Sequence, residues 1–202
     1  MKNLLSDNVQ DGSKLMRSYL LSLSAVTILF FISLEITKLL VVPVQDWFGL
    51  DASYAALLFL PHGVRVVTTY LLGPLSGFLH LVFAVFIVDF AFNLQYYSPE
   101  TLSILLPIIG AASAPLAYML TKFFVGEKYL SLENVNIRTW RIILLVCLLS
   151  SVINSLGQIL AVNSLARTTP DITLVLKYMA GDLFGALTIF LLLIYLFRKL
   201  ER

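Results

Sequence analysis

The chain has 202 residues, of which 59% are hydrophobic and only 13% are charged, and its formal net charge is +2. This composition excludes a soluble globular domain, and the polar pieces between the apolar stretches are too short to bury a core of their own. No nucleic-acid-binding domain is therefore expected, and the lone cysteine, Cys147, excludes an intramolecular disulfide framework.

Six apolar stretches fill most of the chain. They cover residues 18–41, 53–72, 74–96, 100–121, 140–162 and 172–197. A span of about 20 apolar residues crosses the hydrocarbon core of a bilayer. The sequence therefore predicts an all-α bundle of six transmembrane helices over residues 18–202, preceded by a cytoplasmic N-terminal tail, residues 1–17.

The basic side chains are distributed unevenly between the two ends of these stretches. If the N-terminus is cytoplasmic, one basic residue, Arg167, lies in an outer connection and ten lie at inner ends. Those ten are Lys2, Lys14, Arg17, Lys122, Lys128, Arg138, Arg141, Arg198, Lys199 and Arg202. The positive-inside rule then predicts that both termini are cytoplasmic.

The first stretch carries Glu35 and Lys38 near its outer end. A charge at the centre of a bilayer costs at least about 2.5 to 3.5 kcal/mol, so each such side chain needs a partner, water or a function. Glu35 and Lys177 of the last stretch lie at matching depth, which predicts that they pair. The alternative is that Glu35 and Lys38 pair locally at the membrane interface.

The second stretch contains the sequence Leu-Pro-His-Gly-Val-Arg at residues 60–65. Pro61 and Gly63 predict an interruption in the middle of this helix. His62 and Arg65 are three residues apart and share one helix face. A helix break beside such side chains is typical of ligand sites in membrane proteins, although a proline kink can also serve packing alone.

The third stretch carries His80 and Asp89. Asp89 is predicted to join Arg65 or His62, whereas His80 lies toward the inner face and is expected to have a structural role. His62, His80 and Asp89 could together hold a metal ion, but their spacing is not diagnostic, and we predict no metal site.

The next two stretches carry packing signals. Pro107 and Pro115 enclose small residues in the fourth stretch, which favours close packing or a hinge. Asn154 and Gln158 lie four residues apart in the fifth stretch. They are expected to form hydrogen bonds between helices.

The last stretch contains Gly181-Asp-Leu-Phe-Gly185. Two glycines four residues apart allow another helix to approach closely, so Asp182 should face a neighbouring helix rather than lipid. Asp182 and Arg65 have opposite charges at similar depth, and we expect them to pair.

These side chains together predict a polar cluster that is open toward the outer side of the membrane. Its members would be His62, Arg65, Asp89, Asp182, Glu35 and Lys177. The alternative is that they are buried ions that only hold the bundle together. No cofactor and no catalytic residue are predicted, since HExxH, P-loop and strand-borne GxSxG motifs are absent from the sequence.

Two short motifs carry a resemblance to a known family. Residues 58–74, which include Pro61 and Gly63, and residues 181–187, which begin Gly181-Asp182, are similar to motifs of the first type of bacterial membrane-associated sensor domain. The resemblance implies a signal-input role in a bacterial inner (plasma) membrane. Leu60 stands where the family has tryptophan, and that family usually has more spans. No output domain follows Arg202, so the signal is expected to pass to a separate protein.

The leading hypothesis is therefore a membrane sensor that binds an unidentified small ligand or a partner segment in the polar cluster. Arg65 would be the anion-binding or ion-pairing centre, because a guanidinium holds its charge and offers a planar fork. His62 would make the response depend on pH.

Two other functions fit the same sequence. One is a small-solute transporter, or a substrate-binding subunit of an importer of the energy-coupling-factor type. The other is an assembly partner whose intramembrane charges pair with helices of another membrane protein. An enzyme is not expected.

Overall fold

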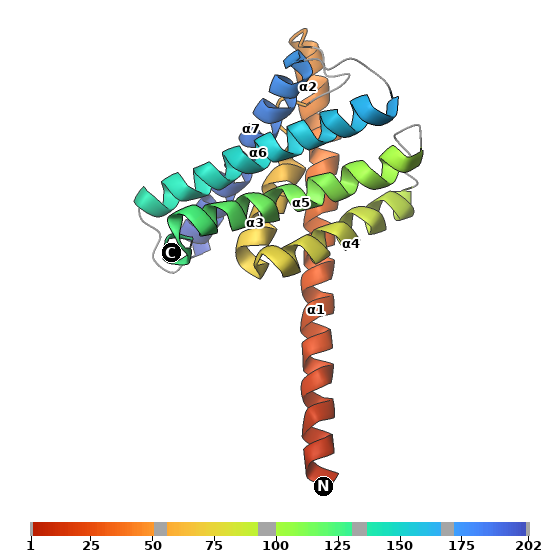
Figure 1. The fold of residues 1–202 in the computed structure, drawn as a ribbon, viewed down its shortest axis with the longest axis vertical. Coiled ribbons are helices and arrows are strands. Elements are labelled where there is room, and N and C mark those ends of the chain that lie inside the picture. The colour runs from red at the N-terminus through yellow and green to blue at the C-terminus, as the bar shows by residue number, and fades with distance from the viewer. Residues whose placement is uncertain (1, 51–55, 93–99, 131–136, 167–171, 201–202) are drawn as a thin grey trace.

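The structure is a computed structural model that describes residues 2–50, 56–92, 100–130, 137–166 and 172–200. This part of the chain is almost entirely helical and contains no strand, so the all-α prediction is confirmed (Figure 1). The helix α1 (Lys2–Ile36) continues through one π-helical turn, η1 (Thr37–Val41), into the short helix α2 (Val42–Trp47).

Five further helices and one 3-10 turn follow. They are α3 (Leu60–Leu72), α4 (Pro74–Phe92), α5 (Glu100–Val125), η2 (Glu127–Tyr129), α6 (Ile137–Ala166) and α7 (Ile172–Leu200). Five segments of the described chain are long and apolar enough to cross a membrane: Lys14–Trp47, Pro74–Phe92, Thr101–Val125, Thr139–Leu165 and Ile172–Leu196. The protein is a multi-pass helical membrane protein, and the remaining expected stretch, residues 53–72, contains α3.

The helix α3 differs from the expected second span. Its 13 residues make it about 20 Å long, less than the hydrocarbon core of about 30 Å. It begins at Leu60, with Pro61 in its first turn, where proline loses no helical hydrogen bond. The interruption expected in the middle of a helix at Pro61 and Gly63 is therefore the beginning of one.

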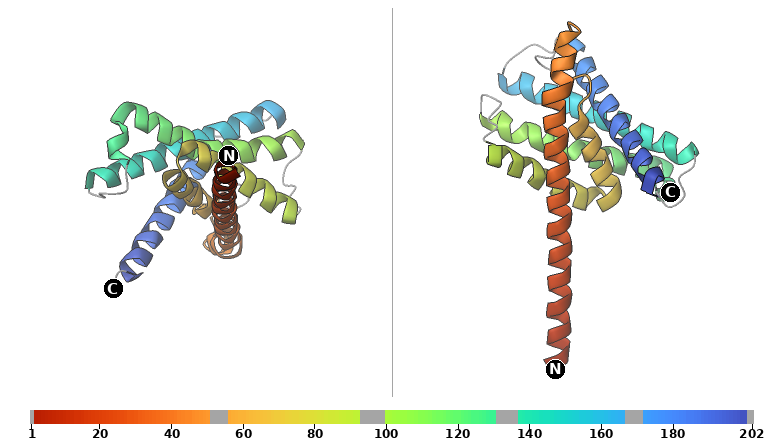
Figure 2. Two further views of the ribbon diagram at one scale, coloured as in Figure 1. Left: turned by 90° about the horizontal axis from the view of Figure 1, so that it is seen from below. Right: turned by 180° about the vertical axis from the view of Figure 1, so that it is seen from behind.

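The short helix α3 is the central element of the bundle. It contacts α1, α4, α5, α6 and α7, and nine of its residues are buried, including all of Leu60–Val66. The helices α4, α5 and α6 lie side by side and cross α1 steeply, while α7 runs obliquely past α6 (Figures 1 and 2). The polar first half of α3 is thus shielded from lipid by the longer helices.

The N-terminal part of α1 extends well beyond the other helices (Figure 2). Tyr19 and Ser22 contact His80 of α4, and the residues before them continue as helix away from the bundle. The expected N-terminal tail is therefore helical from Lys2 and continuous with the first span.

Small residues form the core where α3, α5, α6 and α7 meet. Ala114 and Ala117 of α5, Cys147 of α6 and Ala186 of α7 are fully buried there, in one cluster with Val66 of α3. Their small side chains allow the four helices to approach closely, which places the polar residues of α3, α6 and α7 within contact distance of one another.

Candidate functional site

A polar cluster lies at the first two turns of α3. It contains His62 and Arg65 of α3, Asn154 of α6 and Asp182 of α7, whose exposed fractions are 0%, 5%, 3% and 1%. The structure therefore brings together the three central residues of the expected site. Their burial makes the cluster closed, rather than open to the outer side as the sequence predicted.

The carboxylate of Asp182 has two direct neighbours. Its Oδ2 accepts a hydrogen bond of 2.6 Å from Nδ2 of Asn154 and lies 3.4 Å from Nδ1 of His62. Asp182 therefore faces a neighbouring helix, as expected, but the contact with α3 is made through His62. Among the described residues, Nε2 of His62 has no hydrogen-bond partner although the imidazole is buried.

Arg65 takes a different direction from the one the sequence predicted. Its guanidinium lies against Gly110 of α5, and its Cζ lies 5.6 Å from the ring centre of Phe59 and 5.8 Å from that of Phe30. These distances are within the range of cation–π attraction. Arg65 lies one turn beyond His62 and reaches toward α5 and α1, and its positive charge also acts on Asp182.

The cluster continues along α6. Nε2 of Gln158 donates to Oδ1 of Asn154 at 3.2 Å and to the carbonyl oxygen of Leu106 at 3.4 Å. Asn154 thus connects α6 to α7, and Gln158 connects α6 to α5. The prediction that these two amides form hydrogen bonds between helices is confirmed.

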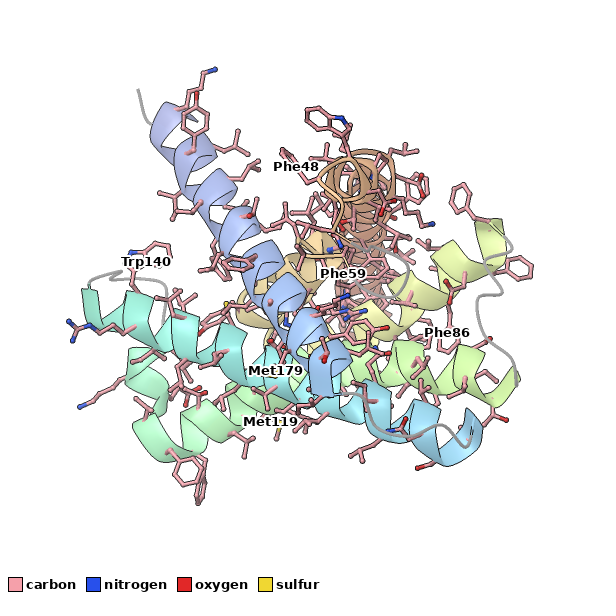
Figure 3. All side chains as sticks on the ribbon, turned by 90° about the horizontal axis from the view of Figure 1, so that it is seen from above. Phe48, Phe59, Phe86, Met119, Trp140 and Met179 are labelled. Carbon is pink, nitrogen blue, oxygen red and sulfur yellow. The ribbon has the colours of Figure 1, made fainter. Side chains whose placement is uncertain are left out.

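The chain that enters α3 is not helical, yet it runs inside the protein. The backbone N–H of Leu57 donates to Oε1 of Gln45 at 2.8 Å, and the N–H of Phe59 donates to the carbonyl oxygen of Gly181 at 2.9 Å. Phe59 lies near the centre of the bundle, close to where α7 crosses it (Figure 3). Non-helical backbone is tolerated at membrane depth only when protein groups satisfy it in this way.

A hydroxyl of η1 supports the first residue of α3. Oγ1 of Thr37 accepts a hydrogen bond from the N–H of Leu60 at 3.3 Å and donates to the carbonyl oxygen of Ser33. Sequence reasoning missed both Thr37 and Gln45. Thr37 lies in the π-helical turn η1, and such turns frequently occur at functional sites, but the apolar pattern of the sequence does not reveal one.

Three glycines bring α7 and the entry to α3 together. A Cβ at Gly181 would collide with the carbonyl oxygen of Ala56, and one at Gly185 would collide with that of Phe59. A Cβ at Gly63 would lie 2.7 Å from Cβ of Ile189. The predicted close approach at Gly181 and Gly185 is confirmed, but a non-helical segment makes it rather than a helix.

The outer charges lie apart from this cluster. Oε1 of Glu35 lies 3.5 Å from Nζ of Lys38, one turn further along the chain. Among the described residues Glu35 forms its ion pair with Lys38, and not with Lys177 as the sequence predicted. Asp89 of α4 is half-buried, and the charge of Lys38 acts on it. The local pair is favoured because Glu35 and Lys38 lie one turn apart where α1 continues into η1.

His80 links α4 to α1. Its Nε2 lies 2.8 Å from Oγ of Ser22, and its Nδ1 lies 2.8 Å from the carbonyl oxygen of Ser76. A carbonyl oxygen only accepts, so Nδ1 carries the proton. These contacts hold His80 away from His62, and in the described part of the chain no three His, Cys, Asp or Glu side chains are placed to bind a metal ion.

Comparison of the chain with protein-family models gave no match, and comparisons with curated proteins and with solved structures gave none either. The helices and the buried cluster define the class of the protein: a multi-pass helical membrane protein with a closed polar centre. Membership of the membrane-associated sensor family stays a prediction.

Proposed function

We propose that this protein is a sensor of the bacterial inner membrane in which a small ligand or a partner segment changes the position of α3. One observation carries the proposal: inside the bundle the first turns of α3 contact η1 through Thr37 and α7 through Asp182, and Asp182 is in turn hydrogen-bonded to Asn154 of α6. The helix is too short to be held by lipid at both of its ends. Its position is therefore set by its neighbours in the bundle, and these polar contacts contribute to it together with the apolar packing.

The closed state of the cluster favours a sensor over a preformed binding site. The contacts of Asp182 are made by Asn154 and His62, so a ligand that binds Asp182 must replace contacts between protein groups. Binding is then coupled to a change of packing, because the ligand favours a conformation in which those contacts are broken. Arg65 would receive an anionic group of the ligand.

The orientation proposed for this function has both termini in the cytoplasm, where a separate signalling protein would receive the output. The course of α7 supports this orientation, since it begins beside α2 and runs back toward the side from which α1 enters (Figure 1). A reporter fused after Arg202 should register as cytoplasmic. A periplasmic readout would contradict the orientation and, with it, the cytoplasmic output.

The movement of α3 can be measured with two spin labels. Cys147 is the chain's one cysteine, so a Cys147→Ala background can carry labels at Leu71 of α3 and Leu192 of α7, both of which are exposed. We expect Asp182→Ala to shift or broaden the distance distribution between the labels. The matched variant Ser155→Ala should leave the distribution unchanged, because the Ser155 hydroxyl bonds only to its own helix.

The same measurement decides against the proposal if the distributions coincide. An identical distance in the Asp182→Ala variant and in the unaltered background means that α3 does not depend on the cluster. The buried polar residues would then only stabilise the bundle.

A further inference from the structure

Basic and aromatic side chains gather where α5 ends and α6 begins. Lys122, Phe123 and Phe124 belong to the last turn of α5, Lys128 lies in η2, and Arg141 lies near the start of α6. The turn η2 contacts both helices, and Leu130, which follows it, is buried in one cluster with Ile142 and Ile143 of α6. We call Lys122, Phe123, Phe124, Lys128 and Arg141 the basic corner.

The two phenylalanines of the basic corner are exposed. Phe123 is 81% exposed and Phe124 is 78% exposed, and their rings contact each other with centroids 5.1 Å apart. The exposed side chains of Met119 and Leu120 precede them on α5. The apolar surface of this span therefore continues without interruption to the basic side chains.

The charges of the basic corner are predominantly positive. Nζ of Lys122 lies 2.7 Å from Oε1 of Glu127, and the side chains of Lys128 and Arg141 are exposed. Three basic side chains and one acidic side chain give these described residues a net charge of +2. The other end of the bundle differs, because the exposed Phe90 of α4 follows the acidic Asp89.

From this arrangement we infer that the basic corner binds the headgroup of an anionic phospholipid. The occupant must present both an apolar part and an anionic part, because Phe123 and Phe124 directly follow Lys122 at the end of α5, and η2, which carries Lys128, contacts both α5 and α6. A phospholipid does this with its acyl chains and its phosphate. An acidic protein surface would match the charges but would leave the two phenylalanine rings exposed.

Trp140 supports the placement of the basic corner at a membrane interface. This indole lies on α6, beside Arg141, at the same end of the bundle (Figure 3). Tryptophan is enriched where acyl chains meet headgroups. The lysines and the arginine then lie at the height of lipid phosphates, and on the cytoplasmic side those lipids include the anionic ones.

The inference can be tested on the full-length protein by native mass spectrometry in mixed micelles. Phosphatidylglycerol and phosphatidylethanolamine would be supplied in equal amounts, and we expect several-fold more phosphatidylglycerol to stay bound. The double variant Lys128→Gln/Arg141→Gln should reduce bound phosphatidylglycerol on the order of tenfold. Phe123→Ala/Phe124→Ala should reduce the retention of both lipids.

A matched pair of variants separates this site from a general effect of charge. Lys14→Gln/Lys199→Gln removes two exposed lysines from the same expected side of the membrane but outside the basic corner. This pair should retain phosphatidylglycerol like the unaltered protein. Equal retention of the two lipids by the unaltered protein, or an equal loss in both double variants, overturns the inference, and melting temperatures without added lipid verify that all variants fold.

Discussion

The guanidinium of Arg65 lies against the backbone of α5 at Gly110. A Cβ atom at position 110 would lie 2.7 Å from Nη2, 2.8 Å from Cζ and 2.9 Å from Nη1 of Arg65. The near equality of these distances means that the flat face of the guanidinium covers the glycine. Gly110 therefore provides the space that a buried, planar cation needs beside a helix.

Replacing Gly110 by alanine should consequently destabilise the protein. The new methyl group would displace a guanidinium that is also in contact with Phe30 and Phe59, and such overpacking costs about 1 to 3 kcal/mol. Unfolding in detergent with increasing denaturant measures the loss. In an Arg65→Ala background the Gly110→Ala change should cost less, because its clash partner is gone; equal costs in both backgrounds would contradict the contact.

Asn154→Ala should weaken the protein more than the neighbouring change Ser155→Ala. Asn154 donates a hydrogen bond of 2.6 Å to the buried Asp182. Without this side chain the Asp182 carboxylate lacks a donor, which lowers the free energy of unfolding by about 1 to 3 kcal/mol. Ser155 is equally buried, but its hydroxyl bonds to the carbonyl oxygen of Ser151 in the same helix, a bond that adds little. The melting temperatures of the two variants measure this difference. Similar values would argue against a stabilising role for the Asn154–Asp182 contact.

Part of this structure could be predicted from the sequence. Apolar length located the helices, and the two glycines around Asp182 indicated that another segment approaches α7 there. Asn154 and Gln158 stood out as amides in an apolar stretch, where they need partners in other helices. Each of these predictions rests on a local property of the chain, which is why it could be made without coordinates.

The start of α3 and the direction of Arg65 could not be predicted in this way. Residues 56–59 are apolar and read as helix, but their backbone is held by Gln45 and Gly181, which are distant in sequence. Counting residues gives the depth of Arg65 and Asp182 but not the side of the bundle to which each side chain points. Their indirect relationship follows from the way α3 packs among five helices.

The glycines of α7 provide a third prediction. Gly181→Ala and Gly185→Ala should each prevent stable folding or cost more than about 4 kcal/mol, because the new Cβ meets backbone carbonyl oxygens that have no room to move. Gly157→Ala is the comparison, since its Cβ would lie 2.7 Å from Cγ2 of Ile109, and displacing a side chain in this way costs about 1 to 3 kcal/mol, less than displacing backbone. Yields of monodisperse protein and melting temperatures should separate the α7 variants from Gly157→Ala.

The hydroxyl of Thr37 provides the last prediction. Thr37→Val keeps the shape of the side chain but removes the acceptor for the N–H of Leu60. The buried N–H then lacks its partner, which lowers the free energy of unfolding by about 1 to 3 kcal/mol. Thr27→Val on the same helix removes only a bond to the carbonyl oxygen of Leu23 and should change the stability little.

Hydrogen exchange at the amide of Leu60 distinguishes this local effect from a general loss of stability. Exchange there should accelerate in Thr37→Val by more than the change in global stability accounts for, because the first turn of α3 loses its support from η1. An unchanged rate at Leu60, or an equal loss of stability in Thr27→Val, would show that Thr37 does not hold the start of α3.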